Sequence, residues 1–184
     1  MIGEVNVLKN ICKHFILIMK HRMKVFKFSI KAGIPWRGFV HDLSKYSPTE
    51  FFESAKYYVG NHSPITECKK DKGYSEAWLH HKGRNKHHHE YWYDYRAPEP
   101  AVMIPYKYAV EMICDTLSAG MTYNGKEWSI DKQLEYWDRE KASSHINEKT
   151  ANFITAVYNE IKENGIDSTI NRKKLKSLFQ KYCG

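Results

Sequence analysis

The sequence lacks the long apolar run that a membrane-spanning segment needs. No window approaches the roughly 18 to 20 consecutive apolar residues of a span. The most apolar run, FILIM at residues 15–19, is flanked by Lys and His on both sides. The opening MIGEVNVLKN also lacks the layout of a secretory signal. We therefore expect no membrane partner.

Closely spaced cysteines and alternating β-branched runs are also missing. The four cysteines stand at positions 12, 68, 114 and 183, without the close spacing of a zinc site or a disulfide framework. This pattern fits a reducing cytoplasm, where we expect the protein to reside. Without alternating β-branched residues nothing indicates a sheet, and no internal repeat is visible.

Helical patterns, by contrast, recur along almost the whole chain. Apolar residues repeat at three- and four-residue steps, and Ser47, Ser129 and either Thr169 or Asn171 stand where helix N-caps are expected. Residues 60–73, which are polar and contain Gly, are predicted to form a loop. The predicted helices are residues 4–32 as one long or two abutting helices, a helix from Pro35 that carries HDLSK, and then 48–59, 74–82, 86–94, 106–124, 130–142, 146–164 and 171–182.

These patterns predict an all-α fold, a single helical domain of seven to nine helices over residues 1–184. The motifs discussed below fall within residues 14–124, and the helices of residues 129–184 complete the domain. At 42% hydrophobic content, 184 residues are enough to bury one sizeable core.

The positive charge is confined to one half of the chain. Residues 1–92 carry 16 Lys and Arg against 8 Asp and Glu, whereas residues 93–184 carry 13 of each, so the whole net charge of +8 lies in the first half. A basic surface concentrates anions such as phosphates. We therefore expect an anionic small-molecule partner, with nucleic acid as an alternative.

Histidine is concentrated in the same half. The stretch HHKGRNKHHHEYW, residues 80–92, holds five of the ten histidines. Further candidates lie on other predicted helices, at His21, at His41-Asp42 and at Asp115. Helical metal sites take ligands scattered in this way over several helices. Mixed imidazoles and carboxylates suit Mn, Fe, Co, Ni or Zn.

The ordered set resembles a known superfamily. His21, His41-Asp42, His81, His88 and Asp115 are similar to the H…HD…H…H…D pattern of the HD-domain metal-dependent phosphohydrolases. HDLSK resembles their HD-x-x-K segment, and CDTLSA resembles the helix that supplies their last Asp. HDLSKYSPTEF and HHK…HHHEYW also resemble an uncharacterised microbial and phage branch near that superfamily. The resemblance covers residues 14–124 and implies a helical protein with one or two divalent metal ions.

Helical geometry narrows the choice among neighbouring histidines. Adjacent helical residues diverge by about 100°, so His80 and His81 cannot face one site, and we choose His81. Within the triple histidine the choice is His88, with His87 in reserve. His21 is preferred to His14, which shares its helical face, because HRMKV matches the family's spacing. The predicted metal ligands are therefore His21, His41, Asp42, His81, His88 and Asp115.

Other residues are predicted to act on the substrate. Glu111 shares a helical face with Asp115 and is a candidate partner of the metal ligands or a general base. The candidate catalytic residues are Asp42, Lys45 and Glu111, and the candidate phosphate contacts are Lys45, Lys82 and Arg84.

The resemblance implies metal-dependent hydrolysis of a nucleotide or another phosphoester. Two alternatives stay open at this point. One is a di-iron oxygenase of the HD type, because the six ligands also suit two irons. The other is a protein that binds or sequesters a nucleotide without turnover.

Overall fold

Ten α-helices account for most of residues 4–184, the part of the chain that this computed structural model describes. Three short 3-10 helices join them, and within the described residues the only extended pairing is an isolated bridge between Tyr93 and Ala101. No described helix is both long and apolar enough to cross a membrane. The α-helices are α1 (Glu4–Lys31), α2 (Pro35–Val40), α3 (Pro48–Lys56), α4 (Pro64–Lys72), α5 (Glu76–Arg84), α6 (Tyr106–Asn124), α7 (Ile130–Ser143), α8 (Glu148–Asn164), α9 (Ile166–Thr169) and α10 (Arg172–Cys183).

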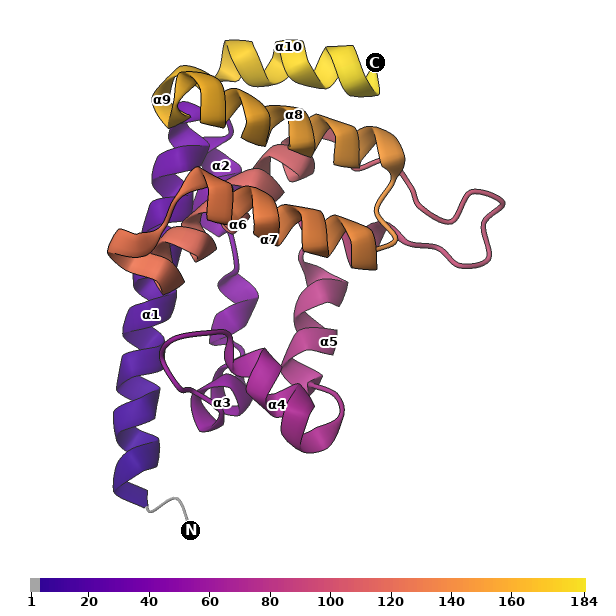
Figure 1. Cartoon of the computed structure of the whole chain (residues 1–184). Coiled ribbons are helices and arrows are strands. Elements are labelled where there is room, and N and C mark those ends of the chain that lie inside the picture. Colours follow the sequence, from indigo (N-terminus) through magenta and orange to yellow (C-terminus); the bar gives the residue numbers. More distant parts are fainter. Residues whose placement is uncertain (1–3) are drawn as a thin grey trace.

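Two groups of helices meet along the long helix α1. Helices α7, α8 and α10 stack across one end of the molecule, whereas α3, α4 and α5 gather toward the other end (Figure 1). Helix α6 packs on α1 and also contacts α8 and α10. Because α1 contacts α2, α3 and α6, it connects the two groups. The all-α fold predicted from the sequence is confirmed.

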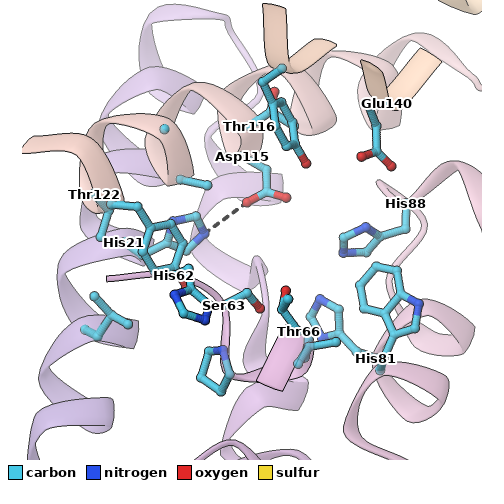
Figure 2. A pocket seen from close by; sticks show the side chains of 18 of the residues that line it. His21, His62, Ser63, Thr66, His81, His88, Asp115, Thr116, Thr122 and Glu140 are labelled. Carbon is cyan, nitrogen blue, oxygen red and sulfur yellow. Dashed lines mark ion pairs between the residues drawn. The ribbon is translucent and has the colours of Figure 1, made fainter. Parts of the chain in front are cut away.

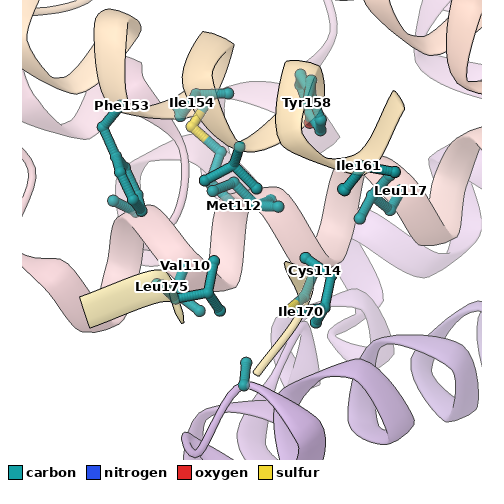
Figure 3. Packing of buried hydrophobic residues seen from close by; sticks show 14 of the residues in the cluster. Val110, Met112, Cys114, Leu117, Phe153, Ile154, Tyr158, Ile161, Ile170 and Leu175 are labelled. Atoms are coloured by element: carbon teal, nitrogen blue, oxygen red, sulfur yellow. The ribbon is translucent and has the colours of Figure 1, made fainter. Parts of the chain in front are cut away.

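The main apolar core lies between α6 and α8. Val110, Ile113 and Leu117 of α6 are fully buried, as are Phe153 and Val157 of α8. These positions recur at three- and four-residue steps on each helix and belong to one apolar cluster, in which Val110 lies beside Leu175 of α10 (Figure 3). The C-terminal helices thus hold α6 in place, and α6 carries part of the site described below.

Side-chain caps start several helices where the sequence indicates. The Ser47 hydroxyl accepts from the Glu50 amide at 3.4 Å, and the Ser129 hydroxyl accepts from the Lys132 amide at 3.3 Å. Of the two candidates for the last helix, Asn171 is the cap, and its side chain accepts from the Lys174 amide at 2.9 Å. Each bond satisfies an amide that the first turn of a helix leaves free.

Three local predictions were wrong. Residues 64–72 form helix α4. Only Pro64 and Cys68 of this short helix are buried, so its polar sequence contains no apolar repeat from which a helix could be predicted. The HDLSK motif lies outside α2, which ends at Val40. Residues 86–94 are not an α-helix and contain only the 3-10 turn His89–Trp92. With α4 and the short α9 included, residues 4–184 hold ten α-helices, more than the seven to nine predicted.

Truncating Phe153 to Ala tests the core between α6 and α8. The ring is fully buried and meets Phe179 edge-on at a centroid distance of 5.2 Å. Its loss would leave a cavity, so we expect the free energy of unfolding in urea to fall by about 3–5 kcal/mol. Phe52→Ala on the exposed side of α3 is the control and should cost less than about 1 kcal/mol. Equal losses in both variants would contradict this core assignment.

Candidate metal centre

Histidines and carboxylates from five segments converge at one place inside the molecule. His21 comes from α1, His81 from α5 and Asp115 from α6. His41 and Asp42 follow the last residue of α2, and His87 and His88 follow the end of α5. The structure thus brings together all six residues predicted as ligands, and adds His87.

A close helix contact fixes the position of His41 and Asp42. A Cβ on Gly38 would lie 2.4 Å from the Ser29 Cβ, so only glycine allows α2 to approach α1 this closely. The Arg22 guanidinium of α1 donates to the His41 carbonyl at 2.8 Å and to the Phe39 carbonyl at 2.9 Å. These contacts hold the residues that follow α2 against the long helix.

Asp42 itself has an unusual backbone. Its φ of 54° and ψ of 28° lie in the left-handed region, and Asp42 is the only described residue other than glycine with a positive φ. Aspartate tolerates this conformation better than most residues, yet such conformations persist mainly where the surrounding structure imposes them, often at functional sites. The turn ends the helical path after His41 and directs the fully buried carboxylate into the cluster.

One group of possible ligands lies toward α1 and α6. His21 Nε2 is 3.0 Å from Asp115 Oδ1, and His41 Nε2 is 3.5 Å from the same oxygen. His41 Nε2 also lies 3.3 Å from Asp42 Oδ2. One ligand atom from each of these four residues falls within 4.8 Å of the others, so His21, His41, Asp42 and Asp115 could hold a metal ion.

A second group lies toward α5. His81 Nε2 and His87 Nε2 are 3.3 Å and 3.4 Å from Asp42 Oδ1. The His87 and His88 rings lie 4.3 Å apart, and both reach the cluster because the chain leaves the helix in a turn at His87, with His88 extended. Asp42, His81, His87 and His88 therefore also meet the requirement for a metal ion. Helical spacing led to the choice of His88 with His87 in reserve, and the structure places both in this group.

Asp42 belongs to both groups. Its Oδ2 faces His41, whereas its Oδ1 faces His81 and His87. Asp115 has a similar arrangement, with Oδ1 near His21 and Oδ2 at 3.6 Å from His87 Nε2. Each of these two carboxylates therefore has oxygens directed toward both groups of possible ligands.

Glu111 orients two of the imidazoles by contacting, in each ring, the nitrogen that faces away from the cluster. Its Oε1 lies 3.1 Å from His41 Nδ1 and 3.4 Å from His87 Nδ1, so both Nε2 atoms point away from it toward the cluster. Arg37 binds the same carboxylate through Nε at 2.7 Å and Nη2 at 3.1 Å. Burial alone would raise the pKa of Glu111, but its bonds to His41, His87 and Arg37 lower it to about 2. Glu111 therefore serves as an ionised acceptor.

Glu50 holds the histidines of α5 in a similar way. Its carboxylate oxygens lie 2.7 Å from His81 Nδ1 and 2.6 Å from His80 Nδ1. In the sequence Glu50 stands three residues after the N-cap Ser47, which is the spacing of a capping box and indicates no contact with His81. No local pattern places Glu50 beside a residue 31 positions further along the chain.

The buried polar atoms of the cluster fit a metal ion. His41 Nε2, His87 Nε2, His88 Nε2 and Asp42 Oδ1 have no hydrogen-bond partner among the described residues, whereas Asp42 Oδ2 is paired with the Lys45 ammonium. Burying such atoms without partners costs several kcal/mol, and a cation would satisfy all of them together. Burial, together with the neighbouring His87 and His81, lowers the pKa of His88 well below its usual value. A neutral imidazole is the form that binds metals.

The cluster borders a cavity of about 840 Å³. His21, His81, His88 and Asp115 face this space, and Ser63 and Thr66 of the α4 segment face it from the other side (Figure 2). The cavity is therefore walled in part by the segment that was predicted to be a loop. Its cationic lining residues are Lys45, Lys69, Lys132 and Arg139.

Two predicted phosphate contacts lie elsewhere. Arg84 is exposed and Lys82 is half-buried, and neither lines the cavity. Lys82 directly follows His81 on α5 and points about 100° away from it. Lys45 does line the cavity, and its Nζ lies 2.7 Å from Asp42 Oδ2.

The remaining histidines of interest have other partners. His14 packs against the Phe51 and Tyr58 rings, and burial lowers its pKa to about 4. It lines the cavity about two helical turns from His21 and belongs to none of the possible metal groups. His89 lines the cavity beside Glu140, with its Nε2 3.7 Å from the Glu140 carboxylate.

The fold and cluster define an all-α protein with a buried histidine and carboxylate centre that could hold metal. Residues 10–160 match the model of a family of unknown function, DUF5662, and the chain belongs to that family. Comparison with curated proteins and with solved structures gives no match. The resemblance to the HD-domain superfamily stays a prediction.

The shared position of Asp42 predicts how metal binding responds to substitution. We expect the purified protein to bind up to two transition-metal ions, measured by elemental analysis after loading with Mn or Co. His21→Ala and His88→Ala should each lose one ion, because each removes a ligand from one group. Asp42→Ala should lose both. If Asp42→Ala retains as many ions as His21→Ala, the carboxylate does not join the two groups.

Glu50→Gln tests whether the carboxylate behind His81 supports metal binding. Glutamine keeps the shape but removes the charge that fixes the orientation of His81, so metal affinity should fall by about 10- to 100-fold in a competition titration with a chelator. Glu163→Gln, on the exposed surface of α8, is the matched control and should bind as the unchanged protein does. An affinity unchanged in Glu50→Gln would exclude this role.

Proposed function

We propose that this protein is a metal-dependent phosphohydrolase that acts on a nucleotide or another phosphoester. The observation that carries the proposal is the Asp42 carboxylate, which faces two groups of metal ligands at the edge of a cavity. One or two divalent ions bound there would polarise a phosphoryl group and activate water for attack on it. The ligand set suits Mn, Fe, Co, Ni or Zn.

The cavity fits an anionic ligand of nucleotide size. Its volume, about 840 Å³, lies in the range of about 300–1,000 Å³ that small-molecule sites occupy. Lys45 lies at the edge of the cluster, and Lys69 of α4 lies above the Trp78 ring at 5.1 Å. Trp78, Trp128 and Tyr136 also line the cavity and offer faces on which a base can stack.

One residue would bind the substrate phosphate, and two others position the metal ligands. Lys45 would neutralise phosphate charge, and its ion pair with Asp42 holds the ammonium beside the metal ligands. Glu111 and Glu50 keep imidazole rings turned toward the ions. We do not assign Glu111 the predicted role of general base, because it is fully buried, bound to Arg37 and absent from the cavity lining.

Two alternatives make different predictions for the loaded protein. The same ligands would suit two irons in an oxygenase, and an iron-loaded protein with the spin signature of a mixed-valent pair would support that function. A protein that only sequesters a nucleotide would bind it tightly and return it unchanged. Phosphate release distinguishes the proposed hydrolase from both.

The activity test uses the protein loaded with Mn or Co. We expect phosphate release from a nucleotide or from a chromogenic phosphoester. Lys45→Ala should lower the rate roughly 10²- to 10³-fold if the ammonium contacts the reacting phosphoryl group, in line with removal of other transition-state donors. Lys45→Arg should restore part of the rate because it returns the positive charge.

Lys82→Ala and Arg84→Ala are the matched controls, since both remove a nearby cation that does not line the cavity. They should retain near-normal rates. Metal content is measured in every variant, so that loss of Lys45 is separated from loss of metal. Metal-loaded protein that releases no phosphate across a broad panel of nucleotides and phosphoesters would overturn the proposal.

A further inference from the structure

Helix α1 has a second face that points away from the metal ligands. Six large apolar residues of this helix are between 42% and 69% exposed. Apart from the adjacent pair Phe15 and Ile16, they follow one another at steps of three, four or seven residues, which places them along one side of the helix. They are Leu8, Phe15, Ile16, Met19, Met23 and Ile30. The buried His21 and Val25 lie on the opposite side.

The segment after α1 extends this apolar face. Trp36, Phe39 and Leu43 are also exposed, and the Trp36 and Phe39 rings stack at 5.7 Å. Arg22 of α1 ties this segment in place through its bond to the Phe39 carbonyl at 2.9 Å. We call the six α1 residues and Trp36, Phe39 and Leu43 the outer apolar face. Isolated exposed apolar residues are common, but a continuous group of this size marks an interaction surface.

The charge beside the outer apolar face has a single sign. Residues 5–41 contain six lysines, two arginines and no Asp or Glu. Lys9, Lys13, Lys20 and Lys27 recur at steps of four and seven, so they form one exposed row next to the apolar side chains. None of the four has an ion pair with a described residue. The surface therefore combines apolar side chains with uncompensated positive charge.

We propose that this face rests on the surface of an anionic lipid bilayer. A helix with an apolar side and flanking lysines lies in the plane of the interface, where the apolar side chains enter the lipid and the lysines meet the headgroups. The exposed apolar residues of α1, from Leu8 to Ile30, extend for roughly 33 Å at 1.5 Å per residue. Long lysine stems can cover apolar surface while their ammonium groups stay in water.

A bilayer fits this face better than a second copy of the chain does. Two copies joined through the outer apolar face would bring together the rows of Lys9, Lys13, Lys20 and Lys27, whose like charges repel one another. The sequence predicts no membrane partner because no apolar run is long enough to cross a bilayer. This criterion does not address a helix that lies along the bilayer surface.

This inference is independent of the proposed phosphohydrolase. His21 and the α1 residues of the outer apolar face lie on opposite sides of the same helix, so a variant can change one without the other. Binding to vesicles and release of phosphate can therefore succeed or fail separately.

The test is sedimentation of the full chain with lipid vesicles. The protein should sediment with vesicles that contain phosphatidylserine, bind phosphatidylcholine vesicles much less, and dissociate as ionic strength rises. The double substitution Ile16→Gln with Met23→Gln should weaken binding by about tenfold or more, because it removes apolar side chains that enter the lipid. Lys13→Gln with Lys20→Gln should weaken it through lost charge.

The controls change equally exposed residues elsewhere. Leu79→Gln on α5 and Lys173→Gln with Lys176→Gln on α10 should bind vesicles as the unchanged protein does. No binding to phosphatidylserine vesicles at low salt, or equal binding by the Ile16 and Met23 double variant, would overturn the proposal. It would also be overturned by a dimer, seen in sedimentation velocity without lipid, that this double variant dissociates.

Discussion

The carboxylate of Asp42 is the group on which the rest of the site depends. It is fully buried, its backbone lies in the left-handed region, and its two oxygens face different sets of histidines. A buried carboxylate between imidazoles that lack other partners is costly unless cations occupy the space. Asp42 is held in this position by the close approach of α2 to α1 at Gly38 and by the hydrogen bonds of Arg22. The local fold around Asp42 therefore places its carboxylate in the cluster.

Two layers of side chains surround this carboxylate. The inner layer consists of imidazoles and carboxylates whose free atoms face one another, and the outer layer holds each ring in orientation. Glu111 and Glu50 belong to the outer layer, and Arg37 keeps Glu111 ionised. Because such partners set the direction of each Nε2 atom, metal affinity depends on residues that never contact the ion. The proposed hydrolase combines this centre with a cavity that Lys45 borders.

Helical periodicity accounts for the part of the structure that the sequence predicted well. The repeats of residues 106–124 place Val110 and Leu117 in the core and predicted α6 correctly. Periodicity does not apply where the chain leaves helical geometry, so it could not decide which of His87, His88 and His89 face inward. It also says nothing of contacts between distant segments. Glu50 has the local pattern of a cap residue, and only the packing of α3 on α5 brings it to His81.

Anomalous X-ray diffraction from crystals of the metal-loaded protein tests the central claim most directly, since it locates each ion relative to Asp42. If Asp42 joins two sites, maps recorded at the absorption edge of the bound metal will show two peaks about 3.5–4 Å apart, one beside each carboxyl oxygen. The ligands of the first will include His21 and His41, and those of the second will include His81 and His88. Peaks away from Asp42, or a single peak beside only one of its oxygens, would contradict the account.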